Sequence, residues 1–160
     1  MNTTTGIVER TFTFMRTHHG PLVARHDDDR FLAVRIARLE QGGALQQWYA
    51  MSRATSLLEF RAALAQTALP GLNTMYADTA GNIYYLHGNA VPRRGAGVDP
   101  HAVLDGGDPA NDWDGVHALG ELPALLNPGS GWIQNAGSSP FLATATGYNL
   151  DREHYPTYMA

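Results

Sequence analysis

Two side-chain amides stand beside a large aromatic residue in the run Trp132, Ile133, Gln134 and Asn135. A primary amide donates two hydrogen bonds through its nitrogen, so such a group can hold a substrate carbonyl or stabilise an oxyanion that forms on it. The same amides can instead satisfy the backbone at the edge of a sheet. The residue types alone leave both interpretations open.

A second aromatic pair, Trp48 and Tyr49, lies where Leu45 and Ser52 complete the spacing i, i+3, i+4, i+7. This spacing predicts a helix that begins near residue 45. The two rings can line a ligand pocket or belong to the core. For a helix considered without its surroundings, the pattern favours the core.

Several other kinds of reactive site are excluded by the sequence. There is no cysteine, and the seven histidines form no H-E-x-x-H motif, which argues against thiol and zinc chemistry. No G-x-S-x-G elbow is present. Gly95 and Gly97 lack the third glycine of a dinucleotide-binding loop, because Pro100 stands in its place. The aspartates between residues 99 and 114 miss the spacing of a calcium loop.

Charge and hydropathy narrow the classes of partner. The 160 residues include 15 acidic and 11 basic side chains, for a net charge of -4. A mildly acidic chain, whose one basic pair is Arg93 and Arg94, is a poor partner for nucleic acid. No apolar run approaches the roughly 20 residues that cross a bilayer, so no membrane partner is expected. Residues 1–5 lack the charged and apolar regions of a signal peptide.

The elements that must position the candidate groups begin with strands. Alternating side chains predict a strand over residues 5–17, and further strands are expected over 22–25 and 31–36. Gly20 and the aspartate turn before Phe31 separate them, which predicts an antiparallel meander in the opening forty or so residues.

Two helices and a hairpin are expected next. After the helix that carries Trp48, a capping-box pattern at Ser56 opens a second helix that ends near residue 68. Strands over 73–77 and 83–86 are then joined by a turn in which Gly81 supplies a positive φ.

The second half of the chain is less regular. The sequence predicts a long loop over 88–115, then a short helix over 119–126 and a strand over 132–135. The tail, 144–160, shows no clear period. The predicted fold class is α+β, mainly antiparallel sheet with two or three helices, in a single domain over 1–160.

Six stretches taken together resemble the penicillin acylase family of N-terminal nucleophile hydrolases. They are 16–23 (RTHHGPLV), 73–78 (NTMYAD), 81–85 (GNIYY), 91–94 (VPRR), 126–135 (LNPGSGWIQN) and 139–141 (SPF). Their order and spacing fit the family over residues 8–160. The most similar branch holds the long-chain amide and acyl-homoserine-lactone acylases, which implies links to antibiotics and quorum quenching.

The resemblance implies a fold and a reaction. Members fold as an αββα sandwich and cleave the amide bond of N-acyl compounds through an acyl-enzyme on an N-terminal Ser, whose own α-amino group is the base. This chain resembles an internal fragment of the larger (β) subunit. The nucleophile is expected upstream of residue 1, so whether the chain by itself is an enzyme is left open.

Four site residues are implied by matching positions. Trp48 and Leu72 match residues that line the acyl pocket, and are expected to bind substrate. Gly137 stands where members have an Asn whose side-chain amide completes the oxyanion hole. Asn135, two residues earlier on an expected strand, would share a face with Gly137 and could partly replace that donor.

A metal site is implied only in part. Pro100 matches a residue whose backbone carbonyl binds structural calcium in some members, but the carboxylate expected downstream would fall near Tyr148. No other cofactor is implied.

Three functional readings follow from the resemblance. The first is an acylase domain acting on a small-molecule acyl amide, the second a non-catalytic module that binds acyl ligands, and the third a fold fragment. A fragment would pair with missing acylase subunit parts or form a homo-oligomer. The resemblance also implies a periplasmic or secreted protein.

Overall fold

The computed structural model describes residues 2–3, 6–7, 9–27, 29–137 and 139–144. The chain comprises two compact units, Met1–Ile36 and Ala37–Ala160, and each is described by itself. The prediction of a single domain over 1–160 stays a prediction. The tail from 145 onward lies outside the described residues.

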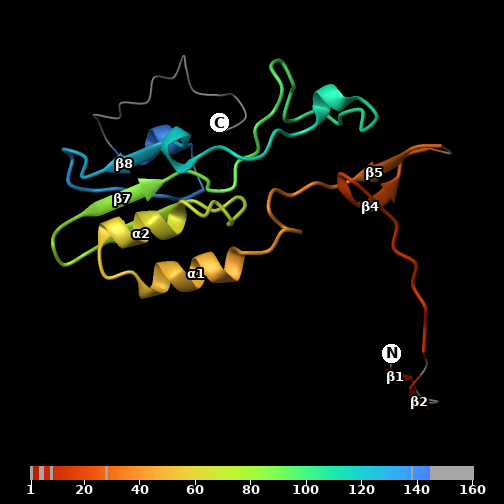
Figure 1. Ribbon diagram of the computed structural model, residues 1–160, viewed down its shortest axis with the longest axis horizontal. Coiled ribbons are helices and arrows are strands. Elements are labelled where there is room, and N and C mark those ends of the chain that lie inside the picture. The colour runs from red at the N-terminus through yellow and green to blue at the C-terminus, as the bar shows by residue number, and fades with distance from the viewer. Residues whose placement is uncertain (1, 4–5, 8, 28, 138, 145–160) are drawn as a thin grey trace. The chain divides into compact units, whose positions relative to one another are not determined.

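The first unit holds two small antiparallel sheets (Figure 1). The strands β1 (Asn2–Thr3) and β2 (Gly6–Ile7) form one pair, and β3 (Arg16–Thr17), β4 (Gly20–Arg25) and β5 (Phe31–Ala33) form a meander in that order. The predicted meander is therefore confirmed in its order, with β3 and β5 shorter and β4 longer than predicted.

The long strand predicted over 5–17 is wrong for most of its described length. Residues 9–15 belong to no strand, and Phe12 and Phe14 are 66% and 88% exposed. Alternation of side chains indicates an extended backbone, but a strand also needs a hydrogen-bonded neighbour. Strand β5 ends at Ala33, short of the predicted residue 36, although the Val34 N–H still donates to the Pro21 carbonyl of β4 at 3.1 Å.

The second unit begins with α1 (Ala44–Arg53) and α2 (Leu57–Leu64). Ser56 caps α2, since its Oγ accepts from the Glu59 N–H at 3.3 Å, while the Glu59 carboxylate reaches back to the Thr55 N–H at 2.7 Å. The capping signal is confirmed. The helix ends four residues before the predicted position, and Thr67 beyond it adopts a φ of +47°.

Three antiparallel strands form the sheet of this unit, in the order β6 (Thr74–Ala77), β7 (Ile83–Leu86) and β8 (Ala124–Leu126). The hairpin of β6 and β7 is confirmed. Gly81 in its turn has a φ of +87°, which residues with a Cβ rarely adopt. Asp78 closes the turn by accepting from the Asn82 N–H at 2.9 Å.

Alternate residues of β7 enter two separate cores. On one face, Tyr84 and Leu86 pack with Leu64 of α2, and on the other, Tyr85 packs with Leu125 of β8. Figure 1 shows α1 and α2 side by side along one side of this sheet. The sheet is thus covered on both faces at β7, which fixes the position of β6 beside the helices.

Two predictions for the later residues are wrong. The helix predicted over 119–126 is a short 3-10 turn, Leu119–Glu121, followed by β8, because Pro123 cannot continue a helix. Residues 132–135 form no strand. The loop over 88–115 is confirmed as mainly irregular, with one 3-10 turn at Pro109–Asn111.

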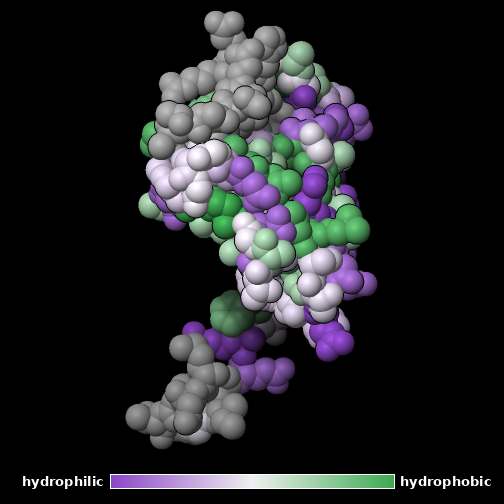
Figure 2. Space-filling model, turned by 90° about the vertical axis from the view of Figure 1, so that its left-hand side faces the viewer, coloured by the Kyte–Doolittle hydropathy of each residue, from purple (hydrophilic) through white to green (hydrophobic). Residues whose placement is uncertain are grey.

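The α+β class is confirmed by these sheets and helices. None of the described helices has the length and apolar character needed to cross a membrane. Apolar side chains also reach the surface, as the green areas of Figure 2 show. The exposed large apolar residues of the second unit include Leu45, Trp48, Leu58, Leu72, Met75 and Trp132.

Candidate functional site

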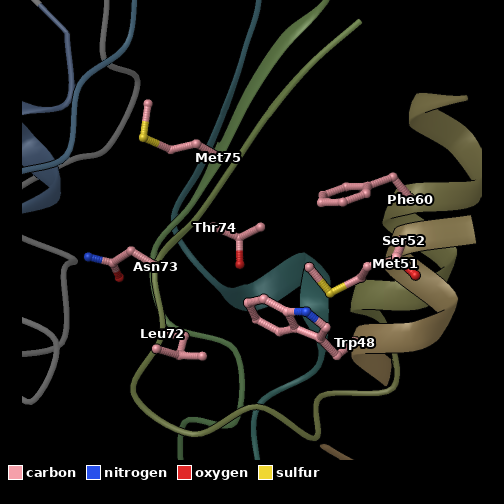
Figure 3. Close-up of a pocket in the computed structure, with 8 residues that line it drawn as sticks. All are labelled: Trp48, Met51, Ser52, Phe60, Leu72, Asn73, Thr74 and Met75. Atoms are coloured by element: carbon pink, nitrogen blue, oxygen red, sulfur yellow. The ribbon is translucent and has the colours of Figure 1, made fainter. Parts of the chain in front are cut away.

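A pocket of about 370 Å³ lies between the two helices and the start of β6. Its lining comes from three places in the chain, as Figure 3 shows. The lining residues are Trp48, Met51 and Ser52 of α1, Phe60 of α2, and Leu72, Asn73, Thr74 and Met75 at β6. The pocket therefore brings together the two residues, Trp48 and Leu72, that the sequence singles out for substrate binding.

Helix α1 is held against the rest of the unit by a buried amide pair. Gln47 is fully buried, its Oε1 accepts from the Ala68 N–H at 2.6 Å, and its Nε2 donates to the Asn89 Oδ1 at 3.0 Å. The Asn89 side chain in turn accepts from the Leu69 N–H at 3.1 Å and donates to the Leu64 carbonyl at 2.9 Å. Because Gln47 precedes Trp48 on α1, these bonds hold the backbone that carries the indole.

No ionisable side chain lines the pocket. The nearest carboxylates in sequence, Glu59 and Asp78, have pKa values held below their usual range, mainly by hydrogen bonds from Thr55 and Asn82 respectively. Both are therefore charged at neutral pH, and both already accept hydrogen bonds, from Thr55 and Asn82 respectively. The described pocket suits an uncharged, mainly apolar group.

Asn73 connects this pocket to a second amide. Its Oδ1 accepts from the Gly88 N–H at 2.9 Å, and its Nδ2 donates to the Asn135 Oδ1 at 3.3 Å. In Figure 3 the side chain of Asn73 points away from Trp48, while the residue borders the pocket. Asn135 thus lies next to Asn73, which borders the pocket, although Asn135 is not itself one of the lining residues.

The orientation of the Asn135 amide follows from its partners. Its Oδ1 also accepts from the Gly137 N–H at 3.2 Å, so the oxygen has two donors. Among the described residues, the Asn135 Nδ2 makes no hydrogen bond. Asn135 is exposed, and its amide nitrogen is available to donate to a ligand.

Gly137 occupies a backbone conformation that explains its identity. Its φ is +71°, and a Cβ added there would meet no atom within 4 Å. Among residues with a side chain, Asn is one of the best tolerated at such angles. The asparagine expected from the resemblance would therefore fit at this position.

The two amides that stand beside Trp132 have different surroundings. The Gln134 side chain donates to the Leu142 carbonyl, and its backbone N–H donates to the Ala143 carbonyl at 2.8 Å. Gln134 therefore satisfies the backbone, as one of the two interpretations expected. Of these two amides, Asn135 keeps its side-chain donor available, beside Asn73.

Pro100 lies in the 88–115 loop, away from the residues that line the pocket. The neighbouring carboxylate of Asp99 accepts from the His101 N–H at 2.9 Å. The position near Tyr148 lies outside the described residues. Calcium at Pro100 therefore stays a prediction.

Sequence reasoning missed part of the lining. Met51 has the same helical face as Trp48, at i+3, and this spacing was available as a signal. Asn73 stands inside the stretch 73–78, but nothing in one sequence indicates that it meets Asn135. Leu45 and Tyr49, which share the predicted helix pattern, are 88% and 66% exposed and lie outside the pocket lining.

The chain is similar in sequence to a known family and to several of its members. The family model for penicillin amidase matches residues 2–159. Penicillin G acylase of Escherichia coli is 35% identical over 133 residues, covering 81% of this chain. The acyl-homoserine lactone acylase PvdQ of Pseudomonas fluorescens (strain Pf0-1) is 31% identical over 130 residues, covering 69% of this chain.

A solved structure is also similar. The thermostable penicillin G acylase from Alcaligenes faecalis matches with a TM-score of 0.72 and 27% identity, over 96% of this chain and 27% of that chain. The chain belongs to the penicillin amidase family. It is a penicillin-acylase-like domain that spans 15% and 16% of the length of the Escherichia coli and Pseudomonas fluorescens relatives.

Proposed function

We propose that this domain forms the acyl-binding and oxyanion-stabilising part of a hydrolase that cleaves the amide bond of N-acyl compounds. The observation that carries the proposal is the pocket shared by Trp48 and Leu72, whose bordering residue Asn73 is hydrogen-bonded to Asn135. An acyl group fills the apolar pocket, and the carbonyl to be attacked lies at the end that Asn73 borders.

The size of the pocket supports an acyl chain of intermediate length. A water-sized group takes up about 30 Å³ of liquid volume, and a methylene group needs a similar space. The volume of about 370 Å³ therefore has room for an acyl chain of roughly six to ten carbons. Aromatic and thioether side chains on its walls, from Trp48, Phe60 and Met51, suit such a chain.

Asn135 supplies the donor to the carbonyl oxygen as negative charge develops on it. Its Nδ2 faces outward because its Oδ1 already has two donors. A donor held in advance in this way needs no rearrangement when the tetrahedral intermediate forms, which is how oxyanion holes accelerate acyl transfer.

The nucleophile is assigned to a part of the family architecture that these residues do not cover. Ser52 lines the pocket, but its hydroxyl donates to the Tyr49 carbonyl at 2.8 Å, and no base lines the pocket beside it. We place the N-terminal Ser of the family in a separate segment or chain that pairs with this domain. Export to the periplasm or medium belongs to the same proposal and rests on the resemblance alone.

Replacing Asn135 with alanine is expected to weaken binding of a neutral acyl amide. The probe is N-methylhexanamide, which the domain binds without turnover in the absence of the nucleophile, and the measurement is titration calorimetry. Loss of one neutral hydrogen bond raises Kd about 3- to 10-fold. An unchanged Kd in Asn135→Ala would contradict the assignment of Asn135 as the carbonyl donor.

The variant Gly137→Asn provides the opposite test at a neighbouring position. It places a second side-chain amide where the resemblance expects one, at a φ of +71° that Asn tolerates. The Kd for the same amide is expected to fall about 2- to 10-fold. Gly137→Asp, which tolerates the same backbone angles but adds a carboxylate that cannot donate, is the matched control and should not lower Kd.

A further inference from the structure

We propose that Asn73 is a positioning residue, which fixes the orientation of the Asn135 amide and thereby makes its nitrogen a donor to the substrate carbonyl. This inference rests on the proposed function, because the donor matters only if an acyl carbonyl binds at Asn135. It assigns a role to Asn73 through a partner side chain rather than through contact with the reacting atoms.

The side-chain amide of Asn73 has a fixed orientation of its own. The Gly88 N–H donates to the Asn73 Oδ1 at 2.9 Å, so the Asn73 nitrogen must face the other way. Gly88 follows β7, where the neighbouring Leu86 is fully buried in the core of the unit. The amide of Asn73 is thus oriented by backbone that the core holds in place.

The fixed amide of Asn73 in turn orients the side chain of Asn135. The Asn73 Nδ2 donates to the Asn135 Oδ1 at 3.3 Å, and the Gly137 N–H donates to the same oxygen at 3.2 Å. Two donors on one oxygen disfavour the flipped amide, in which nitrogen would face both N–H groups. The Asn135 nitrogen is therefore directed away from both.

The isosteric variant Asn73→Asp gives a result that a merely structural role does not. A carboxylate at 73 still accepts from the Gly88 N–H, so the local fold loses less than in Asn73→Ala. It cannot donate to the Asn135 Oδ1, however, and favours the flipped Asn135 amide, with oxygen toward the ligand. Asn73→Asp should therefore harm ligand binding more than Asn73→Ala, although it harms the fold less.

The test is nuclear magnetic resonance of the 160-residue chain, with and without N-methylhexanamide. In the unmodified chain the ligand should shift both the Trp48 indole N–H and the Asn135 side-chain NH2 signals. In Asn73→Ala the Trp48 shift should remain while the Asn135 shift is lost, and Kd should rise about 3- to 10-fold. In Asn73→Asp, Kd should rise further. Asn111→Asp is the control, since its Nδ2 donates to the Asp105 carbonyl in the 88–115 loop.

Failure of this inference can be told from failure of the proposed function. If neither Trp48 nor Asn135 responds in the unmodified chain, the proposed pocket is wrong. The position of Asn73 is read independently from the ligand-free protein, where the two Asn135 amide proton signals should move when Asn73 is replaced. Unmoved signals, or an Asn73→Asp variant that binds better than Asn73→Ala, would overturn the inference.

Discussion

Replacing Gln47 with alanine is expected to lower the free energy of unfolding of the second unit by about 3–5 kcal/mol. The side chain is fully buried and makes hydrogen bonds at both ends of its amide. Its removal leaves the Ala68 N–H without an acceptor, takes one donor from Asn89, and opens a cavity under α1. A buried polar group left without a partner and a newly opened cavity are among the most destabilising results of a core substitution.

The measurement is urea unfolding followed by circular dichroism. Gln46→Ala is the matched control, because Gln46 is the same residue type, next to Gln47 on α1, and is exposed. Its free energy of unfolding should change by less than about 0.5 kcal/mol. A loss below about 1 kcal/mol in Gln47→Ala would mean that α1 is not held by this amide pair.

Replacing Trp48 with alanine is expected to raise the Kd for an acyl amide about 10- to 50-fold while costing less than about 1 kcal/mol of stability. The indole lines the pocket but is 56% exposed. Its apolar surface is therefore buried mainly by a ligand, and only in part by folding. The contribution of a residue to binding and its contribution to stability separate when the site is open to solvent.

Tyr49→Ala tests this separation on the same helix. Tyr49 is 66% exposed and lies outside the pocket lining, so neither Kd nor the melting temperature should change much. The measurements are titration calorimetry with N-methylhexanamide and thermal unfolding of each variant. A large fall in melting temperature with unchanged affinity for Trp48→Ala would place this residue in the core, as helix spacing alone suggested.

The local elements of the second unit could be predicted from the sequence because their signals are local. Ser56 and Glu59 mark the start of α2, and Gly81 marks the turn between β6 and β7. The predicted elements fail where the deciding contact is distant. Residues 9–15 alternate as a strand does but belong to no strand, and residues 132–135 form none either, although the Gln134 N–H donates to the distant Ala143 carbonyl.

The buried face of α1 shows a second limit. The apolar pattern of Leu45 and Tyr49 indicates a helix but selects an exposed side of it. The side that is buried centres on Gln47, a polar residue that hydropathy assigns to the surface. Its hydrogen bonds to Ala68 and Asn89, both far along the chain, make that burial favourable.

The candidate site could likewise be predicted from the sequence only in part. The resemblance selects Trp48 and Leu72, and the structure brings them to one pocket, while their role in binding stays a prediction. The amide pair of Asn73 and Asn135 could not be predicted from the sequence, because the two residues meet only when the start of β6 folds beside the 132–137 segment.

Intermolecular nuclear Overhauser effects from bound N-methylhexanamide locate the acyl chain and the carbonyl end of the ligand at once. We expect contacts from the acyl methylenes to the Trp48 ring and the Leu72 methyl groups, and from the N-methyl end to the side chain of Asn135. Contacts confined to other surfaces, or acyl contacts to the pocket with the N-methyl end remote from Asn135, would contradict the proposed function.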